Sequence, residues 1–217
     1  MYYFIEFDGK LFLVLKNQER TFPSAANEIP FAIKKGASCT VDGETIVFCT
    51  PTLKQFPKEW SYKDDVVSED NVAPIVKKAV VQSKPWKIGK AFILNDRREV
   101  LLVKSGRGPS KNMWSLPGGV SLYGETAAET TVRETEEECG LRVAVVRLLT
   151  VAENASLYNK DIVAFIYQCK RISGVVHPNG DDVIDTKWVP FAEALERYGH
   201  YAFPALKKYF DAGGTVD

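Results

Sequence analysis

The stretch GVSLYGETAAETTVRETEEECGL, from Gly119 to Leu141, decides the fold of this 217-residue chain. Thr126 can cap the amino end of a helix, and Glu129 three residues later completes a capping box. Gly140 suits the left-handed residue that follows a helix end. We therefore predict a helix between Thr126 and Gly140. Small residues recur along one of its faces and suit close packing on a sheet: Ala127, Thr131 and Thr135.

Three glutamates share another face of this helix. Glu134, Glu137 and Glu138 stand at i, i+3 and i+4, which brings their carboxylates within roughly 5–6 Å, whereas Glu136 points elsewhere. Like charges at this spacing destabilise a bare helix, and a bound cation removes that penalty. Oxygen ligands without Cys or His favour Mg²⁺ or Mn²⁺ over zinc. A solvated acidic face is the competing interpretation of such a run.

The spacing within this stretch resembles the signature box of the Nudix hydrolases, which cleave nucleoside diphosphates linked to another group. The preceding segment, from Trp114 to Gly119, is also similar to the family. Thr135 departs from the pattern, because an aliphatic residue is usual there. The residues that carry the resemblance are Gly119, Glu125, Arg133, Glu134, Glu137, Glu138 and Gly140.

The resemblance implies catalytic roles for five of these residues. Glu134, Glu137 and Glu138 match the metal ligands of the family. Glu134 is also a candidate to orient or deprotonate the attacking water. Arg133 matches the residue that ties down the counterpart of Glu125, which braces the loop against the helix. The expected cofactor is Mg²⁺ or Mn²⁺.

The resemblance also points to residues outside the helix. A backbone carbonyl of the turn at Gly118 is expected to help hold a metal, and Asp182 is a candidate for a late acidic ligand. Trp114 is a candidate to stack on a base, with structural packing as the alternative. Tyr158 lies where dinucleoside-polyphosphate hydrolases often have a tyrosine. Arg107 is a candidate to bind the outer phosphate.

The charge pattern suits a phosphate substrate. The net charge is +0, so nothing indicates a bulk polyanion partner, and we expect no nucleic acid. Locally, eight bases and two acids lie between Lys84 and Lys111, whereas six acids and one base lie between Gly124 and Glu138. An acidic helix that binds a cation, next to basic groups, would complement the phosphates of a small nucleotide substrate. Simple solvation of the strand-edge cations remains the alternative.

Composition bounds the class of protein. A hydrophobic content of 45% and a charged content of 26% are ordinary for a globular protein. No apolar run approaches the ~20 residues that span a bilayer, and the N-terminus lacks the features of a signal peptide. The cysteines are scattered, which favours reduced thiols in a cytoplasm. Cys39 and Cys49 are the one pair that could form a disulfide across a hairpin. The other two cysteines are Cys139 and Cys169.

Residues 1–83 are predicted to form a small β-rich domain. Turns at Asp8-Gly9 and Asp42-Gly43 indicate two hairpins. The apolar spacing from Val72 to Val80 favours a helix capped by Asn71, and a strand from Ile75 to Val81 is the alternative. The domain carries no chemical motif. Four roles remain open for this domain: a lid, a partner-binding module, a stabilising domain or a dimerisation arm. The last of these would make the protein a homodimer.

Residues 84–217 are predicted to form the catalytic domain. The stretch Ile162–Gln168 is almost entirely apolar, so we expect burial on both faces. Two helices, Phe191–Tyr198 and Pro204–Phe210, close the chain. The predicted strands are Ala91–Leu94, Val100–Lys104, Val143–Glu153, Asp161–Lys170 and Val183–Pro190.

Together these features predict an α/β chain, a Nudix α/β/α sandwich with a mixed sheet preceded by the β-rich domain. The expected reaction is metal-dependent hydrolysis of a pyrophosphate bond. ADP-ribose, dinucleotides and nucleoside triphosphates remain open as substrates. The rival from another class is a regulator that keeps the fold and binds a nucleotide without cleaving it, although such proteins commonly lose the glutamates retained here.

Overall fold

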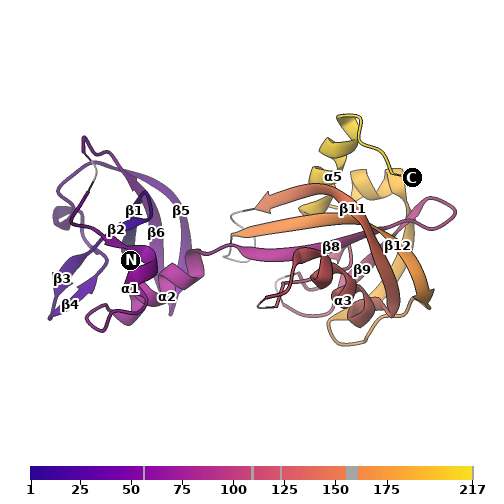
Figure 1. Ribbon diagram of the computed structural model, residues 1–217, viewed down its shortest axis with the longest axis horizontal. Helices are drawn as coiled ribbons and strands as arrows, with labels where there is room; N and C mark the ends of the chain where they lie inside the picture. Colours follow the sequence, from indigo (N-terminus) through magenta and orange to yellow (C-terminus); the bar gives the residue numbers. More distant parts are fainter. Residues whose placement is uncertain (56, 109, 123, 155–160, 217) are drawn as a thin grey trace. The chain divides into compact units, whose positions relative to one another are not determined.

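The computed structural model describes residues 1–55, 57–108, 110–122, 124–154 and 161–216, and the chain folds into two compact units (Figure 1). The N-terminal unit is built from Met1–Pro85. The C-terminal unit comprises Trp86–Asn154 and Ile162–Asp217. The chain passes from one unit to the other between Pro85 and Trp86, and the sequence prediction places this boundary after residue 83.

The N-terminal unit is β-rich, as predicted. Its strands are β1 Tyr2–Phe7, β2 Lys10–Phe12, β3 Val14–Lys16, β4 Glu19–Thr21, β5 Ile33–Val41, β6 Glu44–Pro51 and β7 Ser61–Tyr62. Five of them form one sheet in the order β5-β6-β1-β2-β7, and β3 pairs separately with β4. Strand β1 is antiparallel to β2 but parallel to β6, a long-range pairing that local patterns do not reveal.

Both predicted hairpins are confirmed. Asp8 and Gly9 have φ values of 48° and 74°, and Asp42 and Gly43 have φ values of 50° and 79°. Two consecutive residues with positive φ define the turn whose twist matches that of antiparallel strands, and short polar residues and glycine tolerate it best. The dipeptides therefore fix the β1–β2 and β5–β6 connections.

One hairpin was not predicted. The stretch from Lys10 to Lys16 is divided at Leu13 into β2 and β3, and the chain turns again after β3 at Asn17 and Gln18, whose φ values are 50° and 68°. This second turn pairs β3 with β4. It lacks the glycine that marks the other two turns, so the sequence carries no comparable signal for it.

The helix predicted near the end of the N-terminal unit is confirmed, and the alternative strand is not formed. Helix α2 spans Pro74–Ser83, and its proline occupies the first turn, where the missing N–H is not needed. Ala73 occupies the cap position, so the expected Asn71 cap is wrong; the Asn71 carbonyl accepts the Arg20 N–H instead. The unit also contains η1 Ala26–Glu28 and α1 Lys63–Val66.

All four cysteines are buried, and none of them is joined in a disulfide. Cys39 belongs to the hydrophobic cluster that includes Val76 of α2. Cys49 belongs to another cluster, with Tyr3 and Ile5. Strand register pairs Cys39 with Ile46, so the two thiols do not face each other across the hairpin.

The C-terminal unit contains two three-stranded sheets. Its strands are β8 Trp86–Ile93, β9 Glu99–Ser105, β10 Trp114–Ser115, β11 Leu141–Asn154, β12 Ile162–Gly174 and β13 Val183–Pro190. The sheets have the orders β11-β12-β8 and β10-β9-β13, and β8 is parallel to β12. Strands β8 and β9 follow one another in the chain but enter different sheets, and an isolated bridge between Leu94 and Val100 joins them.

The buried strand β12 differs from its prediction. Ile162, Ala164 and Ile166 are fully buried, whereas Val163 and Phe165 between them are half-buried. The strand therefore alternates, with one face in the core and the other only partly covered. Side-chain alternation is a property of the strand backbone, so an apolar sequence does not by itself place both faces in a core.

Helices pack against these strands. Helix α3 spans Ala127–Cys139 and packs on β8 and β11, whereas α5, Ala202–Asp211, packs on β11 and on α4, Phe191–Arg197 (Figure 1). Phe92 of β8 contacts the rings of Phe191 and Phe210. Within the described residues, no helix has the length and apolar character needed to span a membrane.

Candidate active site

Helix α3 begins and ends where the sequence predicts. The Thr126 hydroxyl accepts the Glu129 N–H at 3.2 Å, and the Glu129 carboxylate accepts the Thr126 N–H at 2.8 Å. Gly140 closes the helix with a φ of 70°. Thr135 is fully buried, and its hydroxyl donates to the Thr131 carbonyl at 2.6 Å. A polar residue thus replaces the usual aliphatic one without leaving an unpaired hydroxyl.

Arg133 ties the loop before the helix to the helix itself. Its Nε and one terminal nitrogen donate to the two oxygens of Glu125, at 2.8 and 3.0 Å. Glu125 also accepts the Leu122 N–H and the Thr130 hydroxyl. The guanidinium, followed by these smaller donors, lowers the pKa of Glu125 to about 2. The bidentate pair fixes the orientation of both side chains.

The same guanidinium reaches two of the helix glutamates. Its other terminal nitrogen donates to Glu134 at 2.8 Å and to Glu137 at 2.9 Å. Glu134 is 18% exposed and lies against the Gly118–Gly119 turn, because a Cβ on Gly119 would lie 2.6 Å from its carboxyl carbon. Glu137 is 56% exposed. Arg133 therefore holds an inner and an outer carboxylate at once.

Glu138 lies on the side of α3 that faces the Gly118–Gly119 turn, and the buried Lys90 contacts the same turn. The Glu138 carboxylate accepts the Gly118 N–H at 2.7 Å. Lys90 of β8 donates to the carbonyl oxygens of Leu116 and Gly118, at 3.0 and 2.5 Å. Burial raises the pKa of Glu138 to about 7 against the opposing effects of Lys90 and the Gly118 N–H. Burial likewise lowers the pKa of Lys90, opposed by Glu138 and Glu134.

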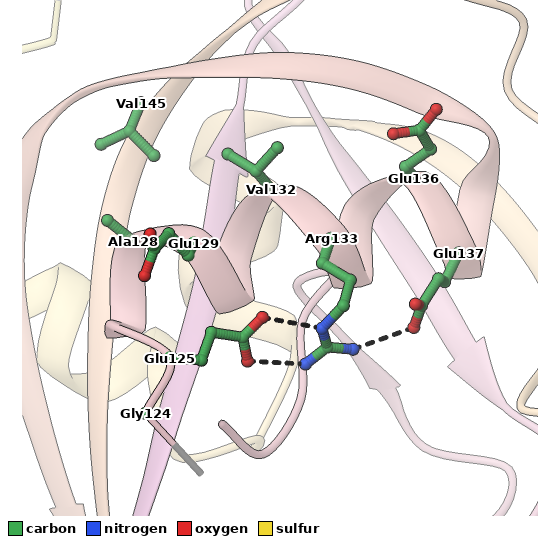
Figure 2. A pocket seen from close by; sticks show the side chains of 9 residues that line it. All are labelled: Gly124, Glu125, Ala128, Glu129, Val132, Arg133, Glu136, Glu137 and Val145. Carbon is green, nitrogen blue, oxygen red and sulfur yellow. Dashed lines mark hydrogen bonds and ion pairs between the residues drawn. The ribbon is translucent and has the colours of Figure 1, made fainter. Parts of the chain in front are cut away.

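A groove of about 950 Å³ runs along the outer side of α3. Figure 2 shows Glu125, Arg133 and Glu137 along one edge, with Val132 and Val145 opposite them. The other residues that line it are Gly124, Ala128, Glu129 and Glu136. The predicted brace therefore borders a concave surface, whereas Glu134 and Glu138 are turned toward the Gly118–Gly119 turn.

The donor set suits a hard divalent cation. Glu134 and Glu138 converge on a turn with a backbone carbonyl, and only oxygen ligands are offered there. Within the described residues, no three acidic, His or Cys side chains converge as a ready metal site. Glu137 is drawn to Arg133 instead. The residues fit Mg²⁺ or Mn²⁺ chemically, and the metal assignment stays a prediction.

The remaining predicted residues lie in three places. Arg107 and Asp182 form an ion pair with each other, so the expected phosphate-binding residue and the expected late ligand neutralise one another. The Trp114 ring packs under Lys187, whose Nζ lies 4.0 Å from the ring centroid and 5.0 Å from that of Tyr198. Tyr158 lies outside the described residues.

Two features of this region escaped the sequence interpretation. The first is Lys90, a lysine within the apolar segment Ile88–Leu94, where it breaks the pattern of a buried strand. Lys187 and Tyr198 flank Trp114 but lie more than seventy residues further along the chain. A single sequence offers no local signal for that contact.

Comparison with known proteins identifies the family. The NUDIX domain model matches residues 89–209 of this chain. The chain therefore belongs to the Nudix family, and the resemblance inferred from the box is confirmed. The α/β fold with a β-rich N-terminal part is confirmed as well.

Curated relatives match the same region. Nudix hydrolases 2 and 6 of Arabidopsis thaliana are 27% and 32% identical over 110 and 112 residues, which in both cases is 49% of this chain and 40% of the relative. The mouse 8-oxo-dGDP phosphatase NUDT18 is 30% identical over 103 residues, 46% of this chain and 31% of its own length. The chain thus spans less than half the length of these relatives.

Solved structures share the fold. A MutT protein from Methanosarcina mazei has a TM-score of 0.55 at 22% identity, covering 61% of this chain and 98% of the other. A MutT NUDIX hydrolase from Burkholderia pseudomallei has a TM-score of 0.50 at 29% identity, covering 57% and 97%. Both matches span nearly all of the other chain and only part of this one.

Proposed function

We propose that this protein hydrolyses a pyrophosphate bond in a nucleoside diphosphate linked to another moiety. The observation that carries the proposal is the network centred on Arg133, which holds Glu125, Glu134 and Glu137 together beside a concave surface. A merely solvated acidic face would leave its carboxylates independent of one another. Membership in the Nudix family supports the same conclusion.

The chain's own residues would divide the work. Glu125 and Arg133 brace the loop so that the helix glutamates keep their places. Glu134 accepts the proton of the attacking water, whose oxygen bonds to one phosphorus while the bond from that phosphorus to the bridging oxygen breaks. Two phosphate products leave. Glu134, Glu137 and Glu138, with the Gly118 carbonyl, would hold Mg²⁺ or Mn²⁺, which neutralises developing charge on the phosphates.

Substrate contacts remain part of the proposal. Trp114 is the candidate to stack on the base, and its ring already packs against the Lys187 cation. Arg107 reaches a phosphate only by leaving Asp182, since the two form an ion pair. A relative named 8-oxo-dGDP phosphatase places an oxidised nucleoside diphosphate among the substrates worth testing.

A substrate panel tests the proposal. The purified protein is incubated with Mg²⁺ and ADP-ribose, NADH, dinucleoside polyphosphates, nucleotide sugars, or normal and oxidised nucleoside di- and triphosphates. Products are separated by anion-exchange chromatography, with and without EDTA. We expect cleavage of one substrate class that EDTA abolishes. Absence of cleavage throughout, together with nucleotide binding measured by calorimetry, would instead support the regulator.

A further inference from the structure

Lys90 is a buried cation at the turn that enters the active site. It lies within strand β8, and only 7% of its surface is exposed. Its Nζ donates to the Leu116 carbonyl at 3.0 Å and to the Gly118 carbonyl at 2.5 Å. A buried ammonium is costly unless it is paired and hydrogen-bonded. Its position therefore calls for acidic partners nearby.

Those partners are two of the three helix glutamates. Burial lowers the pKa of Lys90, and the charges of Glu138 and, to a smaller extent, Glu134 oppose that shift. Glu138 also accepts the Gly118 N–H at 2.7 Å. The two polar groups of one residue, Gly118, are thus divided between the lysine and the glutamate. The contacts join the ammonium, the turn and the carboxylate into one unit.

Lys90 supplies this turn with the two things that a divalent cation would supply: a partner for the Gly118 carbonyl and positive charge near Glu138. The ammonium hydrogen-bonds to the Gly118 carbonyl, one of the oxygens proposed to hold a metal, and supplies positive charge to Glu138. A dication at the same oxygens would compete for the carbonyl and be repelled by the lysine. Glu137 faces away from this unit, because it is held by Arg133 and is 56% exposed.

We propose that Lys90 takes the place of one divalent cation, at Glu138 and the Gly118 carbonyl, and leaves Glu134 and Glu137 to bind the exchangeable metal. Lys90 is a positioning residue, since it acts through Gly118 and Glu138. The proposal reduces the set of metal ligands given under the proposed function to Glu134 and Glu137. It rests on the proposed function only for the location of the metal site. A lysine that merely supports the turn would not alter the number of metals bound.

Mn²⁺ titration by calorimetry, in the absence of nucleotide, tests the inference. Lys90→Met removes the charge and keeps an unbranched side chain, and Lys207→Met removes an exposed lysine of α5 as the matched control. We expect Lys90→Met to bind one more Mn²⁺ per chain than wild type or Lys207→Met. Adding Glu138→Gln to Lys90→Met should remove the extra site. Equal Mn²⁺ numbers in wild type and a folded Lys90→Met would overturn the proposal.

A second variant decides the matter if Lys90→Met does not fold. Glu138→Gln in the otherwise wild-type chain should change Mn²⁺ affinity less than twofold, because Glu138 is assigned to Lys90. A tenfold or greater loss of affinity would overturn the proposal. These readouts are independent of hydrolysis. A protein that binds Mn²⁺ as expected but cleaves nothing would contradict the proposed function alone, and unaltered metal counts in an active enzyme would contradict the lysine assignment alone.

Discussion

Gly89→Ala tests whether the close contact between β8 and α3 positions the active site. A Cβ at residue 89 would lie 2.3 Å from the Ala127 carbonyl oxygen and 2.5 Å from the Thr131 hydroxyl. Non-bonded atoms pack best at about 3.5–4.0 Å, so the helix has to move outward by about 1 Å. The contact involves helix backbone as well as a side chain, so a change of rotamer does not relieve it.

The expected cost follows from this geometry. Overpacking of a well-packed core costs about 1–3 kcal/mol, and the stiffer unfolded chain returns about 0.4–1 kcal/mol. The net loss is therefore about 1–2 kcal/mol, which lowers the melting temperature by several degrees. A displacement of about 1 Å in α3 also moves Glu134 and Glu138, and misplacement on that scale can lower turnover about 100-fold.

Thermal denaturation followed by circular dichroism, together with initial rates on the preferred substrate, measures both effects. Gly199→Ala is the matched control, because nothing lies within 4 Å of a Cβ built there. The control should melt at or slightly above the wild-type temperature with unchanged turnover. If Gly89→Ala behaves like Gly199→Ala in both assays, α3 does not pack on β8 as described.

Three further predictions concern the C-terminal unit. Burial, with a smaller effect from Lys90, lowers the pKa of His200 to about 3. As the pH falls below about 6.5, His200 therefore binds a proton in the unfolded chain but stays neutral in the folded chain. Stability should decline by on the order of 1 kcal/mol per pH unit between about 6.5 and 3, and urea titrations should show a shallower decline for His200→Leu. A decline as steep in that variant would contradict the burial of the ring. Thr135→Val removes the hydroxyl that donates to Thr131 but keeps the side-chain volume, so urea titration should give a change within about 1 kcal/mol; a loss of several kcal/mol would mean that the hydroxyl is needed. Trp114→Phe should abolish any quenching of tryptophan fluorescence by a bound nucleotide and raise KM more than it lowers kcat; unchanged quenching and KM would exclude Trp114 from substrate binding.

The sequence specified α3 because every signal for it is local. The capping box at Thr126 and Glu129 and the left-handed Gly140 act within a few residues of the helix ends, and the structure reproduces them. The ion pair between Glu125 and Arg133 was expected only through the family pattern. Glu125 lies in the loop before the helix, so the periodicity of the helix does not by itself bring it to Arg133.

Long-range contacts could not be predicted in the same way. The parallel pairing of β1 with β6, the separation of β8 and β9 into different sheets, and the reach of Lys90 to Gly118 depend on how distant segments meet. No residue type fixes these partners locally. The free Arg107 expected from sequence became an ion-paired one for the same reason, since Asp182 arrives from a distant loop.

The central claim is that the helix glutamates perform metal-dependent hydrolysis, and turnover of two matched variants tests it most directly. Glu137→Gln and Glu136→Gln change neighbouring residues of α3 by the same atoms, but Glu137 is held by Arg133, whereas Glu136 only approaches Arg142 at 3.8 Å on the surface. With Mg²⁺ and the substrate identified by the panel, Glu137→Gln should lower kcat by orders of magnitude at an unchanged melting temperature, and Glu136→Gln should retain wild-type turnover. Near-normal turnover in Glu137→Gln would contradict the assignment of these glutamates to catalysis.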